Sequence, residues 1–106
     1  MYKLVKKNNG YFRKIANNKT ALNLITKDIN RNISLAVITA IYLSETETTR
    51  YNRIYYILEG KLTLIINNET LILEIGDTCY LSKDSTYIIK GSFSALVINQ
   101  PAFGIL

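Results

Sequence analysis

The sequence contains no histidine and no tryptophan, and only one cysteine and one proline among its 106 residues. Without histidine, the chain has no imidazole to hold a transition metal or to act as a general base near neutral pH. Cys79 is alone, which excludes an internal disulfide and is compatible with a reducing compartment. A thiol nucleophile would need a nearby lysine or carboxylate to lower its pKa, so a packed core cysteine is the favoured interpretation.

Long apolar runs are also missing. The longest, residues 35–43, is broken by Thr39 and Tyr42 and falls short of the ~20 apolar residues that cross a membrane. Residues 1–7 carry charge with no apolar stretch behind them, so we expect no secretory signal, no membrane partner and a cytoplasmic location. The length and the 48% hydrophobic content predict one domain spanning residues 1–106.

The net charge of +5 is concentrated near the start of the chain. Residues 1–31 hold eight Lys or Arg and one acid, Asp28, whereas residues 32–106 hold five Lys or Arg and seven acids. A basic segment of this kind can face nucleic acid. The charges alternate with apolar residues, however, as on the solvated face of strands, so we favour an ordinary surface and predict no nucleic-acid partner.

Helical periodicity is nearly absent, and β-branched and aromatic residues dominate the apolar positions. The pattern therefore predicts an all-β chain of short strands, with turns at Glu59-Gly60, Asn67-Asn68 and Gly76-Asp77 and a loop or frayed strand end over residues 44–50. The predicted strands cover residues 11–16, 21–27, 34–43, 54–58, 61–66, 70–73, 78–81, 86–90 and 93–98. Strands at this spacing form a sandwich or barrel.

Two glycine turns carry a resemblance to a known family. Glu59-Gly60 follows an apolar strand, and Gly76-Asp77 comes sixteen residues later, in the stretch IYYILEGKLTLIINNETLILEIGDTCYLSKDSTYIIKG. This stretch resembles a small cupin, best over residues 51–98. The resemblance implies a double-stranded β-helix, or jelly-roll barrel, with a pocket at one mouth. It also implies pairing through the outer strands, so we expect a homodimer.

The same resemblance locates the positions of the family's metal ligands, which are two histidines flanking one residue, a glutamate and a third histidine. Spacing from the two glycines puts Thr46 and Thr48 at the paired histidines, Arg53 at the glutamate and Tyr87 at the last histidine. None of these is a transition-metal ligand. A one-residue slip brings Glu47 near, but one carboxylate beside a guanidinium is a poor cation site. We therefore predict no metal and no other cofactor.

A ligand site without metal is the alternative use of the barrel. Because strand residues alternate between faces, Arg53 and Tyr55 point the same way. A guanidinium beside phenol rings suits an anionic or sugar-like ligand. Equally open is an internal salt bridge of Arg53 with Glu45 or Glu47 in a core filled by tyrosines. The predicted ligand-binding residues are Arg53, Tyr55 and Tyr87, with Thr46, Thr48 and Tyr51 at the mouth.

Three functions are consistent with these residues. The preferred one is a metal-independent, cupin-like domain that binds a small anionic or sugar-like metabolite and has no catalytic residue. The second is a metal-independent sugar or sugar-nucleotide isomerase or epimerase that uses a tyrosine as general acid, which ranks lower because such enzymes generally use a histidine base. The third is a structural or partner-binding dimer, which would be marked by a closed core with Arg53 paired internally.

Overall fold

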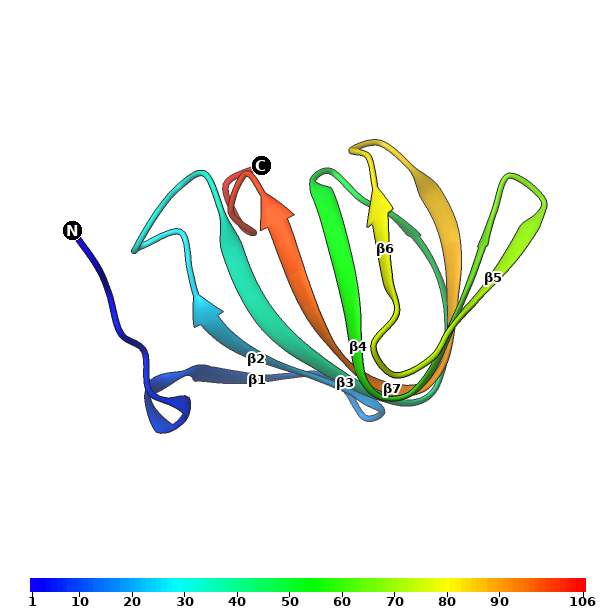
Figure 1. Ribbon diagram of the computed structural model, residues 1–106, viewed down its shortest axis with the longest axis horizontal. Coiled ribbons are helices and arrows are strands. Elements are labelled where there is room, and N and C mark those ends of the chain that lie inside the picture. The colour runs from blue at the N-terminus through cyan, green and yellow to red at the C-terminus, as the bar shows by residue number, and fades with distance from the viewer.

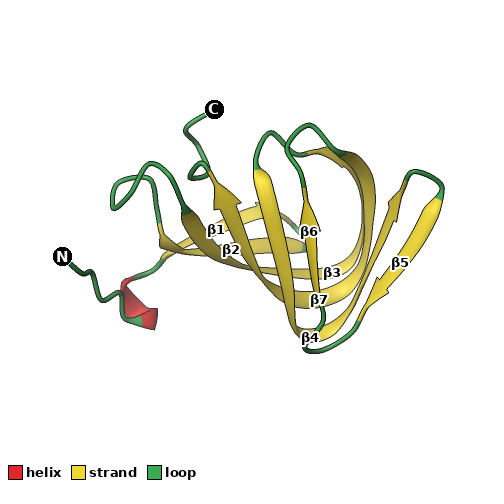
Figure 2. Ribbon diagram, turned by 45° about the horizontal axis from the view of Figure 1, so that its top comes forward, coloured by secondary structure: helices red, strands yellow, loops and turns green.

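The computed structural model describes residues 1–106 and consists almost entirely of β-strands, apart from a short 3-10 turn at Lys7–Asn9 (Figure 2). The predicted all-β class is confirmed. No helix is long and apolar enough to span a membrane. The strands are β1 (Tyr11–Ala16), β2 (Lys19–Ile25), β3 (Ser34–Thr48), β4 (Asn52–Ile66), β5 (Glu69–Leu73), β6 (Thr78–Leu81) and β7 (Thr86–Gln100).

Three strands of fifteen residues, β3, β4 and β7, form the frame of the molecule. The strand order is β1-β2-β3-β7-β4-β5, all pairs are antiparallel, and β6 also pairs with β4. The strand β6 pairs with the first half of β4, and β5 pairs with the second half. The long strands curve so that their two halves face each other across the interior (Figure 1). Each long strand therefore contributes to both layers of the barrel.

Glycines make these bends possible. Gly60 on β4 and Gly91 on β7 have φ of 74° and 125°. A Cβ atom on Gly60 would lie 2.1 Å from the carbonyl oxygen of Ser92, and one on Gly91 would lie 2.4 Å from that of Lys61. Both positions require glycine because β4 and β7 approach too closely for a side chain.

Two predicted breaks in the chain are wrong. Glu59-Gly60 is a bend inside β4, because the register shift between Ile57 and Glu59 turns the strand without reversing it. Likewise, residues 86–90 and 93–98 belong to one strand that bends at Gly91. The polar segment 44–50 is mostly strand, since Ser44 to Thr48 pair with β7. The backbone hydrogen bonds with β7 hold this segment in a strand although its side chains are polar, and these side chains alternate between the two faces of the sheet.

The barrel interior is filled by residues that alternate along the strands. Thirteen buried residues form one core cluster, and Cys79 is half-buried and packs against it, as predicted. Burial raises the pKa of the Cys79 thiol, which favours the unreactive protonated form. The core cluster consists of Ala40, Leu43, Tyr55, Ile57, Leu62, Leu64, Leu73, Leu81, Tyr87, Ile89, Phe93, Ala95 and Val97.

Candidate functional site

Arg53 is the centre of a polar network inside the barrel. Its backbone pairs with Asn99 of β7 on one side and Leu81 of β6 on the other, so its side chain points inward and is only 7% exposed. The guanidinium donates from Nε to Asn99 Oδ1 at 2.8 Å and from Nη1 to the Tyr87 hydroxyl at 3.0 Å. Nη1 also forms an ion pair with the Glu47 carboxylate. Arg53 therefore joins three strands.

The two predicted tyrosines belong to the same network. The hydroxyls of Tyr55 and Tyr87 are 2.9 Å apart, and Tyr87 donates a hydrogen bond to Glu47. Burial raises the pKa of both phenols, and for Tyr87 the shift is large. Both phenols therefore keep their protons, so Tyr87 accepts from Tyr55 and Arg53 while it donates to the carboxylate.

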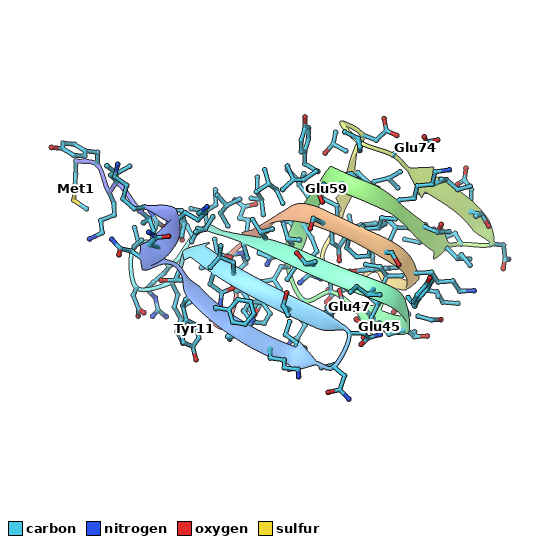
Figure 3. The ribbon with its side chains drawn as sticks, turned by 90° about the horizontal axis from the view of Figure 1, so that it is seen from below. Met1, Tyr11, Glu45, Glu47, Glu59 and Glu74 are labelled. Atoms are coloured by element: carbon cyan, nitrogen blue, oxygen red, sulfur yellow. The ribbon has the colours of Figure 1, made fainter.

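Glu47, rather than the predicted Thr46 and Thr48, points from β3 toward Arg53 and Tyr87 inside the barrel. Both threonines are exposed on the outer face of β3, and Thr48 bonds there to Thr86 at 2.7 Å. The reason is the period of two in a strand, because a one-residue error in counting moves a side chain to the opposite face. The inward side chains are those of Glu45 and Glu47, which come from the same part of β3 (Figure 3).

Arg53 forms one of the two internal salt bridges that the sequence left open as alternatives to ligand binding. Glu47 is the partner of Arg53, whereas Glu45 pairs with Lys19 of β2 at 2.6 Å. Burial by itself would lower the pKa of Arg53. The nearby oxygens of Tyr55, Tyr87 and Glu47 favour the charged guanidinium more strongly, so the pKa of Arg53 is raised above its ordinary value. The guanidinium therefore stays charged and already has an acidic partner within the chain.

The last predicted site residue, Tyr51, connects the network with the C-terminal tail. Its ring lies 6.0 Å from Arg53 Cζ, and its hydroxyl accepts a hydrogen bond of 2.8 Å from the Gly104 amide. Phe103 packs on the Tyr51 ring at 5.6 Å between centroids, and its amide donates to Ser34 Oγ at 2.9 Å. These contacts fix the tail beside one end of the barrel.

A cavity of about 290 Å³ lies under this tail. Asn99 is shared between the cavity wall and the Arg53 network. Arg53, Tyr55 and Tyr87 do not line the cavity. The lining residues are Arg13, Asn23, Ile25, Thr26, Lys27, Asp28, Ser34, Leu35, Ala36, Asn99, Phe103 and Gly104.

Sequence reasoning missed Arg13, Lys27 and Asn99. On β1 the usual pattern is inverted, because the apolar Phe12 is 63% exposed whereas Arg13 is half-buried opposite the buried Ala21. Only the pairing of β1 with β2 reveals this inversion. The sequence therefore carried no local signal that Arg13 points inward.

The comparisons with known proteins identify the fold. Neither protein-family models nor curated proteins match the sequence. Among solved structures, an RmlC-like cupin from Shewanella frigidimarina superposes with a TM-score of 0.80 at 13% identity, over 98% of this chain and 95% of that one. The chain has the cupin fold. KdgF from Halomonas sp. superposes with a TM-score of 0.83 at 7% identity, over 98% of this chain and 97% of that one. Streptomyces PAC13 with uridine superposes with a TM-score of 0.79 at 10% identity, over 98% of this chain and 85% of that one.

The interior of this cupin barrel does not fit the divalent metal that the family resemblance implies. The structure contains no group of three His, Cys, Asp or Glu side chains that could hold a metal ion. Where the resemblance assigns metal ligands, Arg53 carries positive charge; of the two inward carboxylates nearby, Glu47 is paired with Arg53 and Glu45 with Lys19. This guanidinium would repel a cation placed beside it, so the residues at these positions are unsuited to hold a divalent metal.

Proposed function

We propose that this protein is a metal-independent cupin that binds a small anionic or sugar-like metabolite in the cavity under its C-terminal tail. The observation that carries the proposal is a cavity whose polar lining includes Arg13, Lys27 and Asn99 in a barrel without a metal-ligand set. Its volume of about 290 Å³ is close to the lower limit of small-molecule sites, roughly 300 Å³. A ligand of the size of a single sugar fits this space better than a dinucleotide.

The Arg53 network has a supporting role in this proposal. Arg53 pairs with Glu47, so it is not free to serve as the sole anchor for an anion. Its hydrogen bond to Asn99 nevertheless supports one wall of the cavity. Tyr55 and Tyr87 hydrogen-bond to each other, and Tyr87 also donates to Glu47. Neither phenol lines the cavity, which favours binding over tyrosine-based catalysis.

One structural neighbour holds a ligand that includes a sugar. The PAC13 structure holds uridine, which contains a sugar ring. The likeness is one of fold, so it supports a small-molecule pocket in a barrel of this shape. The class of ligand depends on the residues that line the cavity of this chain.

We further propose that the protein is a homodimer. The outer face of the layer formed by β1, β2, β3, β7, β4 and β6 is apolar, although this face normally meets water in an antiparallel sheet. One row of side chains crosses β1, β2, β3, β7 and β4 in register, and a second row crosses β3, β7, β4 and β6. The two rows are Phe12, Leu22, Val37, Leu96 and Tyr56, and Leu35, Ile98, Ile54 and Tyr80.

No charged side chain interrupts these rows, and Phe12, Tyr56 and Tyr80 are 63%, 41% and 61% exposed. Contiguous apolar surface of this kind marks an interface in soluble proteins. A second copy is the occupant we propose, because an apolar face without charge can pack against the same face of another copy about a two-fold axis.

A metabolite screen with a cavity-filling variant tests the binding proposal. We expect at least one anionic or polyhydroxylated compound to raise the melting temperature of the wild-type protein, because a ligand that binds only the folded state stabilises it. Ala36→Leu, which adds bulk to the cavity wall, should abolish that shift, whereas Ala16→Leu on the exposed end of β1 should preserve it. A hit that persists in Ala36→Leu would place the ligand elsewhere and contradict the proposal.

A further inference from the structure

Asn99 links the buried network to the cavity, and its side-chain amide has only one suitable orientation. Arg53 Nε donates to Asn99 Oδ1 at 2.8 Å, and an N–H group must face the amide oxygen rather than the amide nitrogen. The Nδ2 group forms no hydrogen bond within the protein, although Asn99 is only 5% exposed and lines the cavity. Asn99 therefore offers an unpaired donor to an occupant of the cavity.

Arg13 adds a second unpaired donor from β1. Its Nε atom is the one buried side-chain nitrogen or oxygen in the protein without a hydrogen-bond partner. The guanidinium is held over the Phe103 ring, with Cζ 5.5 Å from the ring centroid. Lys27 lines the same cavity, and neither it nor Arg13 belongs to a salt bridge. An unpaired buried donor such as Arg13 Nε is costly, and Arg13 and Lys27 carry positive charge without an acidic partner. The lining therefore favours an occupant that accepts hydrogen bonds and carries negative charge.

The other polar residues that line the cavity indicate the charge of the ligand and its further polar groups. Asp28 faces the same cavity as Arg13 and Lys27, so the charged side chains of the lining carry one net positive charge. This balance suits one carboxylate better than a phosphate dianion, which Asp28 would repel. Asp28, Asn23 and Thr26 also supply acceptors for hydroxyl groups.

We infer that the cavity binds a hydroxycarboxylate, meaning a small monocarboxylic acid that also carries hydroxyl groups. Asn99 Nδ2, Arg13 and Lys27 hold the carboxylate, and the side chains around Asp28 accept hydrogen bonds from the hydroxyls. Arg53 acts as a positioning residue, because its hydrogen bond turns the Asn99 amide toward the ligand. The inference rests on the proposed binding function and names the ligand class of that same cavity.

Calorimetric titration of the full chain tests this class with four probes. Gluconate carries both a carboxylate and hydroxyls, glucose carries only hydroxyls, hexanoate carries only a carboxylate, and glucose 6-phosphate carries a dianion. We expect gluconate to bind at least about tenfold more tightly than each of the others, because each of them lacks one matched group or adds charge.

Two variants with a matched control locate the carboxylate. Asn99→Asp keeps the oxygen that Arg53 needs and replaces the free donor by a repelling oxygen, so it should raise the Kd for gluconate about tenfold or more without loss of fold. Arg13→Gln should have a similar effect. Lys14→Gln removes the same charge from the neighbouring exposed residue and should leave the Kd unchanged, since only long-range electrostatics are altered.

The outcomes separate this inference from the broader function. If a neutral sugar or glucose 6-phosphate binds more tightly than gluconate, or if Asn99→Asp and Arg13→Gln bind as the wild type does, the hydroxycarboxylate class is wrong. Small-molecule binding would then still stand on the metabolite screen. If gluconate does not bind and the screen gives no hit, both proposals fail.

Discussion

At the scale of single residues, Arg53 stabilises the interior through its buried polar contacts. Replacing it by Met keeps the apolar stem but leaves the Glu47 carboxylate without its cation and Asn99 Oδ1 without its donor. We expect Arg53→Met to lower the free energy of unfolding by about 2 kcal/mol, below the usual cost of breaking a buried pair because Glu47 retains 27% side-chain exposure. Urea denaturation measures this loss.

Arg50 provides the matched control, since it is exposed and three residues away in sequence. Arg50→Met should change the free energy of unfolding by about 0.5 kcal/mol or less. Equal stability of the two variants would mean that the Arg53 network contributes nothing to the fold.

The phenols of the network predict a loss of stability at alkaline pH. The folded pKa values of Tyr55 and Tyr87 are raised by burial above the value of about 10 expected in the unfolded chain. Their contribution is therefore fully present below about pH 10 and is lost as the pH rises further, because the unfolded state releases protons first. Urea midpoints at about pH 8 and pH 10.5 should fall more in the wild type than in a Tyr55→Phe/Tyr87→Phe variant. An equal fall would show that these phenols do not resist ionisation.

At the scale of elements, Gly60 at the bend of β4 and Gly76 in the turn between β5 and β6 are needed for different reasons. Gly60 needs both a positive φ and the absence of a Cβ, whereas Gly76 has a φ of 88° with nothing within 4 Å of an added Cβ. Gly76→Ala should therefore cost only the conformational strain, about 1 kcal/mol. Gly60→Ala must also displace the backbone of Ser92 and should destabilise the protein far more, as thermal melting of the two variants would reveal. Similar melting temperatures would contradict the close approach of β4 and β7.

The elements also show how far the sequence predicts this fold. Alternation and turn residues locate most strands, and the turns at Asn67-Asn68 and Gly76-Asp77 lie where the sequence predicts them. The sequence predicts strand ends at Gly60 and Gly91, where the structure has bends, because glycine permits a reversal and a bend equally well. Which of the two occurs depends on pairing between distant strands, and that information is not local.

At the scale of the whole molecule, the apolar outer face predicts the oligomeric state. We expect light scattering after size exclusion to give a dimer, because exposed rows of apolar side chains gain from mutual burial. Tyr56→Lys, in the middle of this face, should produce a monomer, whereas Tyr42→Lys should not, since Tyr42 is 88% exposed at the bulge in β3. A wild-type protein that stays monomeric at high concentration would contradict this interface.

The site, too, is a property of the whole molecule. The cupin resemblance placed Arg53 and Tyr87 inside the barrel, and strand alternation added Tyr55 to the same face; the three side chains do meet there. The cavity, in contrast, is formed by β1, β2, the start of β3, the end of β7 and the tail. Arg13, Lys27 and Asn99 lie far apart in the sequence, and only the sheet order brings them together, so no motif could mark them.

The central claim is that the barrel binds its ligand without a metal. The most direct test is a thermal-shift measurement on chelator-treated protein, in which the metabolite set is added with EDTA and again with Mn²⁺, Fe²⁺, Ni²⁺ or Zn²⁺. We predict the same hits and the same shifts in both series, because Arg53 already supplies the positive charge in the barrel. Shifts that appear only after a metal is added, or a shift caused by the metal alone, would contradict this account.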